Sequence, residues 1–130
     1  MDQVQIGTPE TFVALAPAGR VMDAWPVDVA IVAGAFRGGF RAELDMRAFR
    51  QALERLYDTL EGSASLHCVE GSLDIEVTCA GQGRIRVKAT ARPSPHKAEL
   101  QLSEEIDQSY LPAILSAIDR LFLSPANEPD

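Results

Sequence analysis

The sequence predicts an α+β domain in which an antiparallel sheet of six or seven strands carries two helices on one face. Two segments place apolar residues at spacings of three and four, which is typical of amphipathic helices. Residues 63–103 alternate apolar and polar side chains, which is typical of half-buried strands. The length of 130 residues favours one domain. We expect it to span residues 1–123 and to leave a frayed tail at 124–130.

The first part of the chain predicts one short strand and then a hairpin. Residues 11–15 form the strand, and a loop rich in alanine, glycine and proline follows it. Residues 27–35 carry apolar side chains on both faces, as in a strand covered on both sides. The pair Gly38-Gly39 permits a tight turn, because glycine adopts backbone angles that other residues avoid. Residues 40–44 then return as the second strand of the hairpin.

Residues 46–61 predict the first helix. Asp45 precedes it and can accept a hydrogen bond from the free amides of its first turn. Gly62 follows it at the place where a C-cap glycine is common. The apolar stripe consists of Met46, Phe49, Leu53, Leu56 and Leu60.

Residues 63–103 predict a four-stranded antiparallel meander, because three consecutive loops preserve one buried face. The loops set residues 64–68 opposite 73–77, residues 75–79 opposite 85–89, and residues 87–91 opposite 98–102. This register separates Cys68 from Cys79 by about 20 Å along the strand direction, which is too far for a disulfide. We therefore expect both cysteines to be core thiols.

Residues 109–123 predict the second helix, with Ser109 as N-cap and Pro112 within the first turn, where a missing amide hydrogen is tolerated. Glu104, Glu105 and Asp107 would then place negative charge near the positive end of the helix dipole.

Charge and hydropathy limit the function. The net charge of -7 should repel nucleic acid. The sequence contains no stretch of about 18 apolar residues, the length needed to span a bilayer, and its N-terminus does not have the pattern of a secretory signal. The sequence thus predicts a cytoplasmic protein that binds neither nucleic acid nor membrane.

No catalytic, cofactor or metal site is predicted. His67 falls opposite Asp74, and the two could act as a general base and its orienting partner, although a cross-strand polar pair explains them better. Cys68, Cys79 and His96 supply further zinc-ligand types, but not the spacing that zinc sites use. An alternative function is binding of a small molecule or anion by the open sheet face through His67, Arg86 and Lys88.

Five segments together resemble a known group of proteins. They are FRGGF, LDMRAFRQALERLYDTLEGSASL, LDIEV, GRIRV and IDQSYLPAILSAIDRL. The chain resembles, over residues 36–122, small bacterial proteins that include Wap-type immunity proteins, the antidotes to secreted polymorphic toxins. The most distinctive part is Asp107–Leu111. The resemblance implies a non-catalytic binding protein and supplies no catalytic residues.

The leading hypothesis is therefore an immunity protein that neutralises a toxin domain by direct binding. Many toxin domains are basic, so an acidic surface would speed and orient their capture. The expected partner contacts are Glu104, Glu105, Asp107, Gln108, Tyr110 and Asp119. Two alternatives stay open beside the anion-binding domain: an enzyme built on His67 and Asp74, and a homodimer formed through an edge strand.

Overall fold

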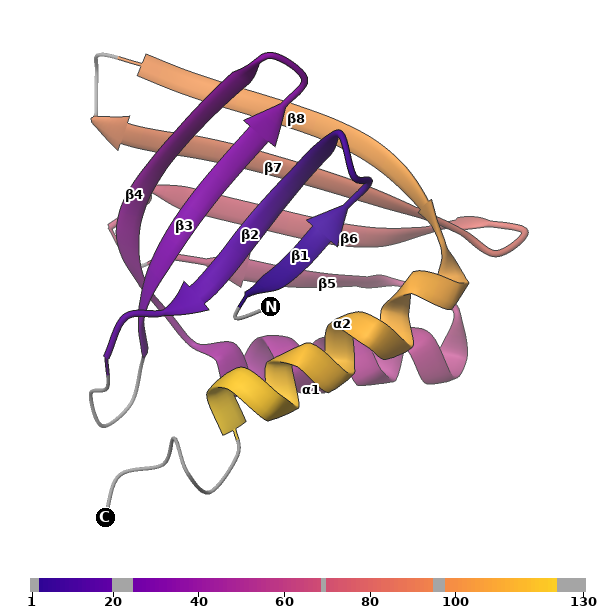
Figure 1. Cartoon of the computed structure of the whole chain (residues 1–130). Helices are drawn as coiled ribbons and strands as arrows, with labels where there is room; N and C mark the ends of the chain where they lie inside the picture. The colour runs from indigo at the N-terminus through magenta and orange to yellow at the C-terminus, as the bar shows by residue number, and fades with distance from the viewer. Residues whose placement is uncertain (1–2, 20–24, 69, 95–97, 124–130) are drawn as a thin grey trace.

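The computed structural model describes residues 3–19, 25–68, 70–94 and 98–123 (Figure 1). The strands are β1 Val4–Gly7, β2 Thr11–Pro17, β3 Trp25–Ala33, β4 Phe36–Leu44, β5 Ser63–His67, β6 Leu73–Gly81, β7 Arg84–Ser94 and β8 Ala98–Asp107. The helices are α1 Met46–Thr59 and α2 Leu111–Ile118, with a 3-10 turn at Gln108–Tyr110 before α2 and a π turn at Asp119–Leu123 after it. The tail at 124–130 and His96 lie outside the described residues.

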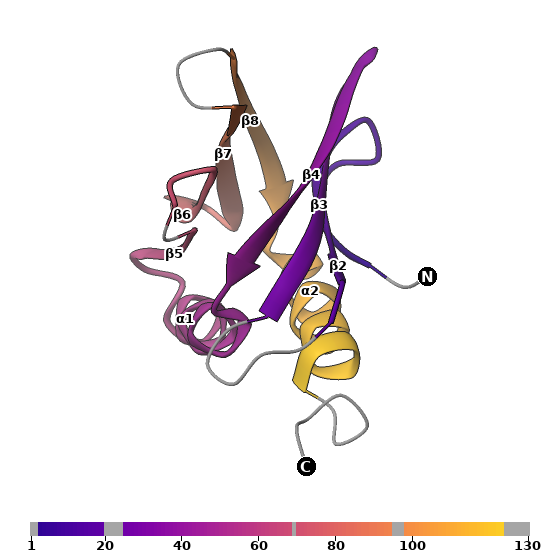
Figure 2. The same ribbon diagram turned by 90° about the vertical axis from the view of Figure 1, so that its left-hand side faces the viewer.

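The α+β class is confirmed, but the prediction of one sheet is wrong. The strands form two antiparallel sheets of four, in the orders β1-β2-β3-β4 and β5-β6-β7-β8. The helix α1 separates β4 from β5 along the chain, and it packs against β5 and α2. Figure 2 shows that the two sheets face each other, with both helices at one end and the sheets diverging toward the other. Each sheet therefore turns one face inward to a shared core.

The N-terminal sheet contains a strand that the sequence did not reveal. β1 pairs with β2, which sets Val4 opposite Leu15 and Ile6 opposite Val13. An alternation of only two apolar residues in four is too short to distinguish a strand from a loop. β1 is an edge strand as a result, and β4 forms the opposite edge of the same sheet.

The predicted turn at Gly38-Gly39 is also wrong. The chain turns at Gly34 and Ala35, and Gly34 takes the positive φ of 64° that the turn requires. Gly38 and Gly39 lie inside β4, opposite Ile31 and Ala30. Either glycine site could have turned the chain on local grounds, so only the pairing of β3 with β4 decides between them. The consequence is an edge strand with two glycines in its middle.

The meander of the second sheet is confirmed, with one local correction. Leu66 lies opposite Ile75, and Val77 lies opposite Val87, as predicted. The last ladder is shifted by two residues, so that Ala91 faces Leu100 instead of Ala98. The reason is an irregularity between Ala91 and Ser94, which lets β7 run on to Ser94. A shift of two keeps every side chain on its predicted face.

The caps of the helices differ in part from expectation. Asp45 caps α1 as predicted, since its Oδ1 accepts a hydrogen bond from the Ala48 amide at 3.0 Å. The C-cap is Leu60 and not Gly62, because Leu60 itself adopts the left-handed conformation with φ of 55°. Before α2 the capping side chain is Asp107 and not Ser109: Asp107 Oδ2 accepts from the Ser109 amide at 3.0 Å. Pro112 follows as the second residue of α2.

One hydrophobic core joins the two sheets and the two helices. Phe49 of α1 and Phe122 of the π turn are fully buried. The ring of Phe122 meets Trp25 of β3 edge to face, with centroids 6.5 Å apart. Both cysteines are free; Cys68 is buried and Cys79 is half-buried. Among the described residues, no helix is long and apolar enough to cross a membrane.

Candidate functional site

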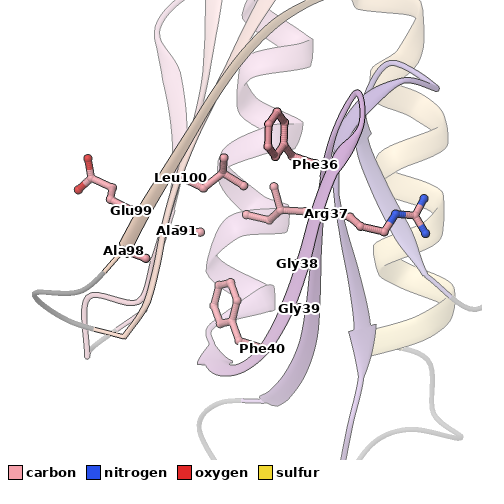
Figure 3. A pocket seen from close by; sticks show the side chains of 10 residues that line it. Phe36, Arg37, Gly38, Gly39, Phe40, Ala91, Ala98, Glu99 and Leu100 are labelled. Atoms are coloured by element: carbon pink, nitrogen blue, oxygen red, sulfur yellow. The ribbon is translucent and has the colours of Figure 1, made fainter.

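An apolar cleft lies between the two sheets, at the end away from the helices. Its volume is about 240 Å³. β3 and β4 line one wall, and β7 and β8 line the other; the lining residues are Ile31, Phe36, Arg37, Gly38, Gly39, Phe40, Ala91, Ala98, Glu99 and Leu100. The side chains of Phe36, Phe40 and Leu100 point into the space between the sheets, whereas Arg37 and Glu99 point away from it (Figure 3). The cleft therefore presents apolar surface with its charges at the rim.

Phe36 makes this cleft unusual. It is 74% exposed, the highest value among the large apolar side chains that the structure describes as exposed. A side chain of this size normally buries itself, and exposed aromatic residues at a pocket rim are typical of protein-binding surfaces. Gly38 adds to the opening, because a Cβ built there would meet no atom within 4 Å. The cleft could not be predicted from the sequence, because Gly38 and Gly39 were expected to form a turn and not part of a strand that lines it.

The outer faces of the two sheets differ in chemistry. The centre of the outer face of the first sheet carries small or apolar side chains, and a shallow hollow there is lined by Gln3, Phe12, Ala14, Ala30, Val32, Arg37, Gly38 and Gly39. This hollow shares Arg37, Gly38 and Gly39 with the apolar cleft. The outer face of the second sheet carries mainly polar and charged side chains, among them His67, Asp74, Glu76, Arg86 and Lys88. The apolar cleft and this hollow therefore both border β4.

Three of the six predicted partner contacts are engaged within the chain by other side chains. Asp119 forms a two-pronged ion pair with Arg50, with Nε–Oδ1 and Nη2–Oδ2 distances of 2.9 and 3.0 Å, and Arg50 also pairs with Glu54. Glu105 lies 3.6 Å from Arg84. Glu104 accepts a hydrogen bond from the Thr8 hydroxyl at 3.3 Å. These acids stabilise the fold locally and are not all free to meet a partner.

The remaining three predicted contacts cluster before α2. The Asp107 carboxylate accepts hydrogen bonds from Ser109, and these hold the pKa of Asp107 below its ordinary value. The Gln108 side chain packs beside Gly83, and its buried Oε1 has no hydrogen-bond partner among the described residues. Tyr110 is 43% exposed and borders a groove between β1 and α2. Asp119 lies apart from them, at the opposite end of α2.

His67 and Asp74 do meet, and they belong to a chain of ion pairs across the second sheet. His67 Nδ1 lies 2.6 Å from Asp74 Oδ1, and Arg92 Nη1 donates to Asp74 Oδ2 at 3.1 Å. Arg92 Nε donates in turn to Glu99 at 2.7 Å. Within the described ranges, His67 makes no hydrogen bond to a nucleophilic side chain. The arrangement is that of a cross-strand polar network.

The residues of the anion-binding alternative are less well placed. Arg86 and Lys88 lie on β7, on the same outer face as His67 but two strands away from it, and His67 is already bonded to Asp74. Neither cation has an ion-pair partner among the described residues. The same part of the chain contains no group of three His, Cys, Asp or Glu side chains that could hold a metal ion.

The Asp74 network predicts a pH dependence of stability. Burial raises the pKa of the Asp74 carboxyl, but the hydrogen bonds from His67 and Arg92 lower it by more, so its pKa lies below the ordinary value. Because the folded pKa is depressed, this contribution is fully present above about pH 4 and is lost as the pH falls through the folded pKa. We expect Asp74→Asn to lower the free energy of unfolding at neutral pH and to flatten its fall on acidification.

Urea unfolding at a series of pH values from neutral to acidic measures how the free energy of unfolding of Asp74→Asn depends on pH. Glu76→Gln is the matched control, because Glu76 lies on the same face of β6 and has no ion-pair partner in the described part of the chain. An acid limb that is as steep in the Asp74 variant as in the Glu76 variant would contradict the assignment.

The fold is a small α+β domain with an apolar cleft between its two sheets. The chain belongs to the Immunity protein WapI-like family, whose sequence profile matches residues 11–124. The match includes β2 to β8 and both helices. No curated protein matches the chain, and no solved structure does either.

Proposed function

We propose that this protein neutralises a bacterial toxin domain by binding it directly, without catalysing a reaction. Membership of the WapI-like immunity family over residues 11–124 is the observation that carries the proposal. The apolar cleft supports it, because Phe36 leaves a large aromatic surface exposed on the edge strand β4. Aromatic anchors of this kind contribute much of the binding free energy in protein interfaces.

Capture followed by a growth assay tests the proposal. The tagged chain is used to capture partners from extracts of its own host at low and high salt, and each partner is then expressed in a test bacterium with and without this chain. We expect one partner that stops growth when alone and is harmless when co-expressed. If no captured partner inhibits growth, or if the chain gives no protection, the proposal is wrong.

The acidic balance of the chain predicts that capture is electrostatically assisted. Asp58 and Glu61 are exposed acids near the C-terminal end of α1, and neither forms an ion pair within the described residues. Their reversal to lysine should spare the fold, because cations are favourable near a helix C-terminus. We expect the double reversal to slow association with a basic toxin domain and to flatten its salt dependence.

The rate of association at several salt concentrations measures the effect. Replacing the same two residues with glutamine removes charge without reversing it, so this control should fall between the reversed variant and the original chain. An association rate that is equal in all three would contradict the electrostatic part and leave direct binding standing.

A further inference from the structure

The edge strand β4 is open along its first half. β4 is the last strand of its sheet, so the backbone groups on its free side have no strand partner among the described residues. Residues 36–39 are exposed. Natural proteins usually protect such edges with charges, prolines or bulges, and this segment has only Arg37. The first half of β4 can therefore accept another strand.

The cleft side of this edge forms a socket for one apolar side chain. Phe36, Gly38 and Phe40 share the inward face because side chains alternate along a strand. The space above Gly38 is empty to 4 Å, between the two aromatic side chains, and Leu100 points in from the opposite wall (Figure 3). A strand added to β4 would direct every second side chain into this space.

The other face of the same edge selects for a carboxylate. Arg37 points away from the cleft, is exposed, and has no ion-pair partner in the described part of the chain (Figure 3). Its neighbour on β3 is the apolar Val32. Four residues further along β4, Arg41 pairs with Asp28 of β3 at 3.1 Å. A carboxylate on an added strand would complete at Arg37 the cross-strand pair that Arg41 already has.

We propose that an extended segment of the toxin domain pairs with the free edge of β4. It places an apolar side chain beside Gly38 in the cleft and an acidic side chain beside Arg37 on the outer face. This inference rests on the proposed function for the identity of the partner. Strand addition of this kind takes affinity from backbone hydrogen bonds and specificity from alternate side chains.

Two peptides of the same length as β4 test the site without the toxin. Both alternate valine with threonine, and the central threonine is replaced by glutamate in one and by lysine in the other. Binding is followed through the backbone amide signals of the isotope-labelled protein. We expect the glutamate peptide to shift the signals of residues 36–40, and the preference for glutamate to fall about fivefold in the Arg37→Glu variant.

Arg86→Glu is the matched control for charge. It makes the same change of net charge on the second sheet, at an exposed cation that has no ion pair with any residue the structure describes, so the preference should stay as in the original chain. Gly38→Leu fills the socket at a backbone angle open to any residue, and it should weaken both peptides about tenfold or more. Gly39→Ala, on the opposite face of β4, should change little.

The proposal is overturned by any of three results. Neither peptide shifts the signals of residues 36–40 at about 1 mM; the preference changes equally in the Arg37 and Arg86 variants; or sedimentation shows a dimer that Phe36→Ser dissociates, which makes a second copy the occupant. A competition experiment separates the β4 proposal from the proposed immunity function: the peptides are tested for their ability to displace the captured toxin. If the chain protects growth but the peptides do not displace the toxin, the immunity function stands and β4 is not its binding site.

Discussion

Replacing Phe122 with alanine is expected to lower the free energy of unfolding by about 3–5 kcal/mol. Phe122 is fully buried, and its ring meets Trp25 at the start of β3. Phe122 therefore packs the C-terminal helical segment against the first sheet. Removing the ring leaves a cavity between these layers, and the loss of the edge-to-face contact adds to the cost. Urea unfolding followed by circular dichroism measures the change.

Phe36→Ala is the matched control, since it makes the same truncation at a site that is 74% exposed. We expect it to change the free energy of unfolding by no more than about 0.5 kcal/mol. Equal losses in the two variants would mean that Phe36 is a structural residue and would weaken its assignment to a binding surface. Unequal losses would leave binding as the reason for an aromatic side chain at the rim.

Local patterns were sufficient to locate both helices and, apart from the β7–β8 register, to pair the strands of the second sheet. In residues 63–103 each loop is short, so the buried face of one strand fixes that of the next, and the pairing of Leu66 with Ile75 follows from sequence alone. The same argument fails across α1. Fourteen residues of helix separate β4 from β5, so alternation on either side cannot show whether the two strands pair. This is why one sheet was expected where two exist.

The site was harder to foresee than the fold. The two glycines of FRGGF favoured a turn within this segment. The exposure of Phe36 follows only from the actual turn at Gly34, which makes Phe36 the first residue of β4. The intramolecular partners of the predicted acidic contacts were hidden for a different reason. Asp119 meets Arg50 across 69 positions of sequence, and no spacing rule links residues on different helices. The sequence alone thus reveals the acid Asp119 but not its pairing with Arg50.

Gly7→Ala is expected to destabilise the protein by about 2 to 5 kcal/mol, as the sum of backbone strain and overpacking. Gly7 ends β1 with φ of 135°, a backbone conformation that residues other than glycine rarely adopt. A Cβ there would lie 2.3 Å from the Thr11 carbonyl oxygen and 2.8 Å from the Phe12 Cα. Both contacts are with backbone, so the β1–β2 hairpin must distort to relieve them.

The hairpin also carries a link between the sheets, because the Thr8 hydroxyl donates to Glu104 of β8. Its distortion should therefore be felt in the second sheet as well as in β1. Gly38→Ala is the control, because its Cβ would meet no atom within 4 Å and its φ is not positive; we expect a change of about 0.5 kcal/mol or less. We therefore expect the two glycines to differ: the backbone requires glycine at position 7, whereas the fold tolerates a side chain at position 38. Similar losses in both variants, measured by urea unfolding, would refute this distinction.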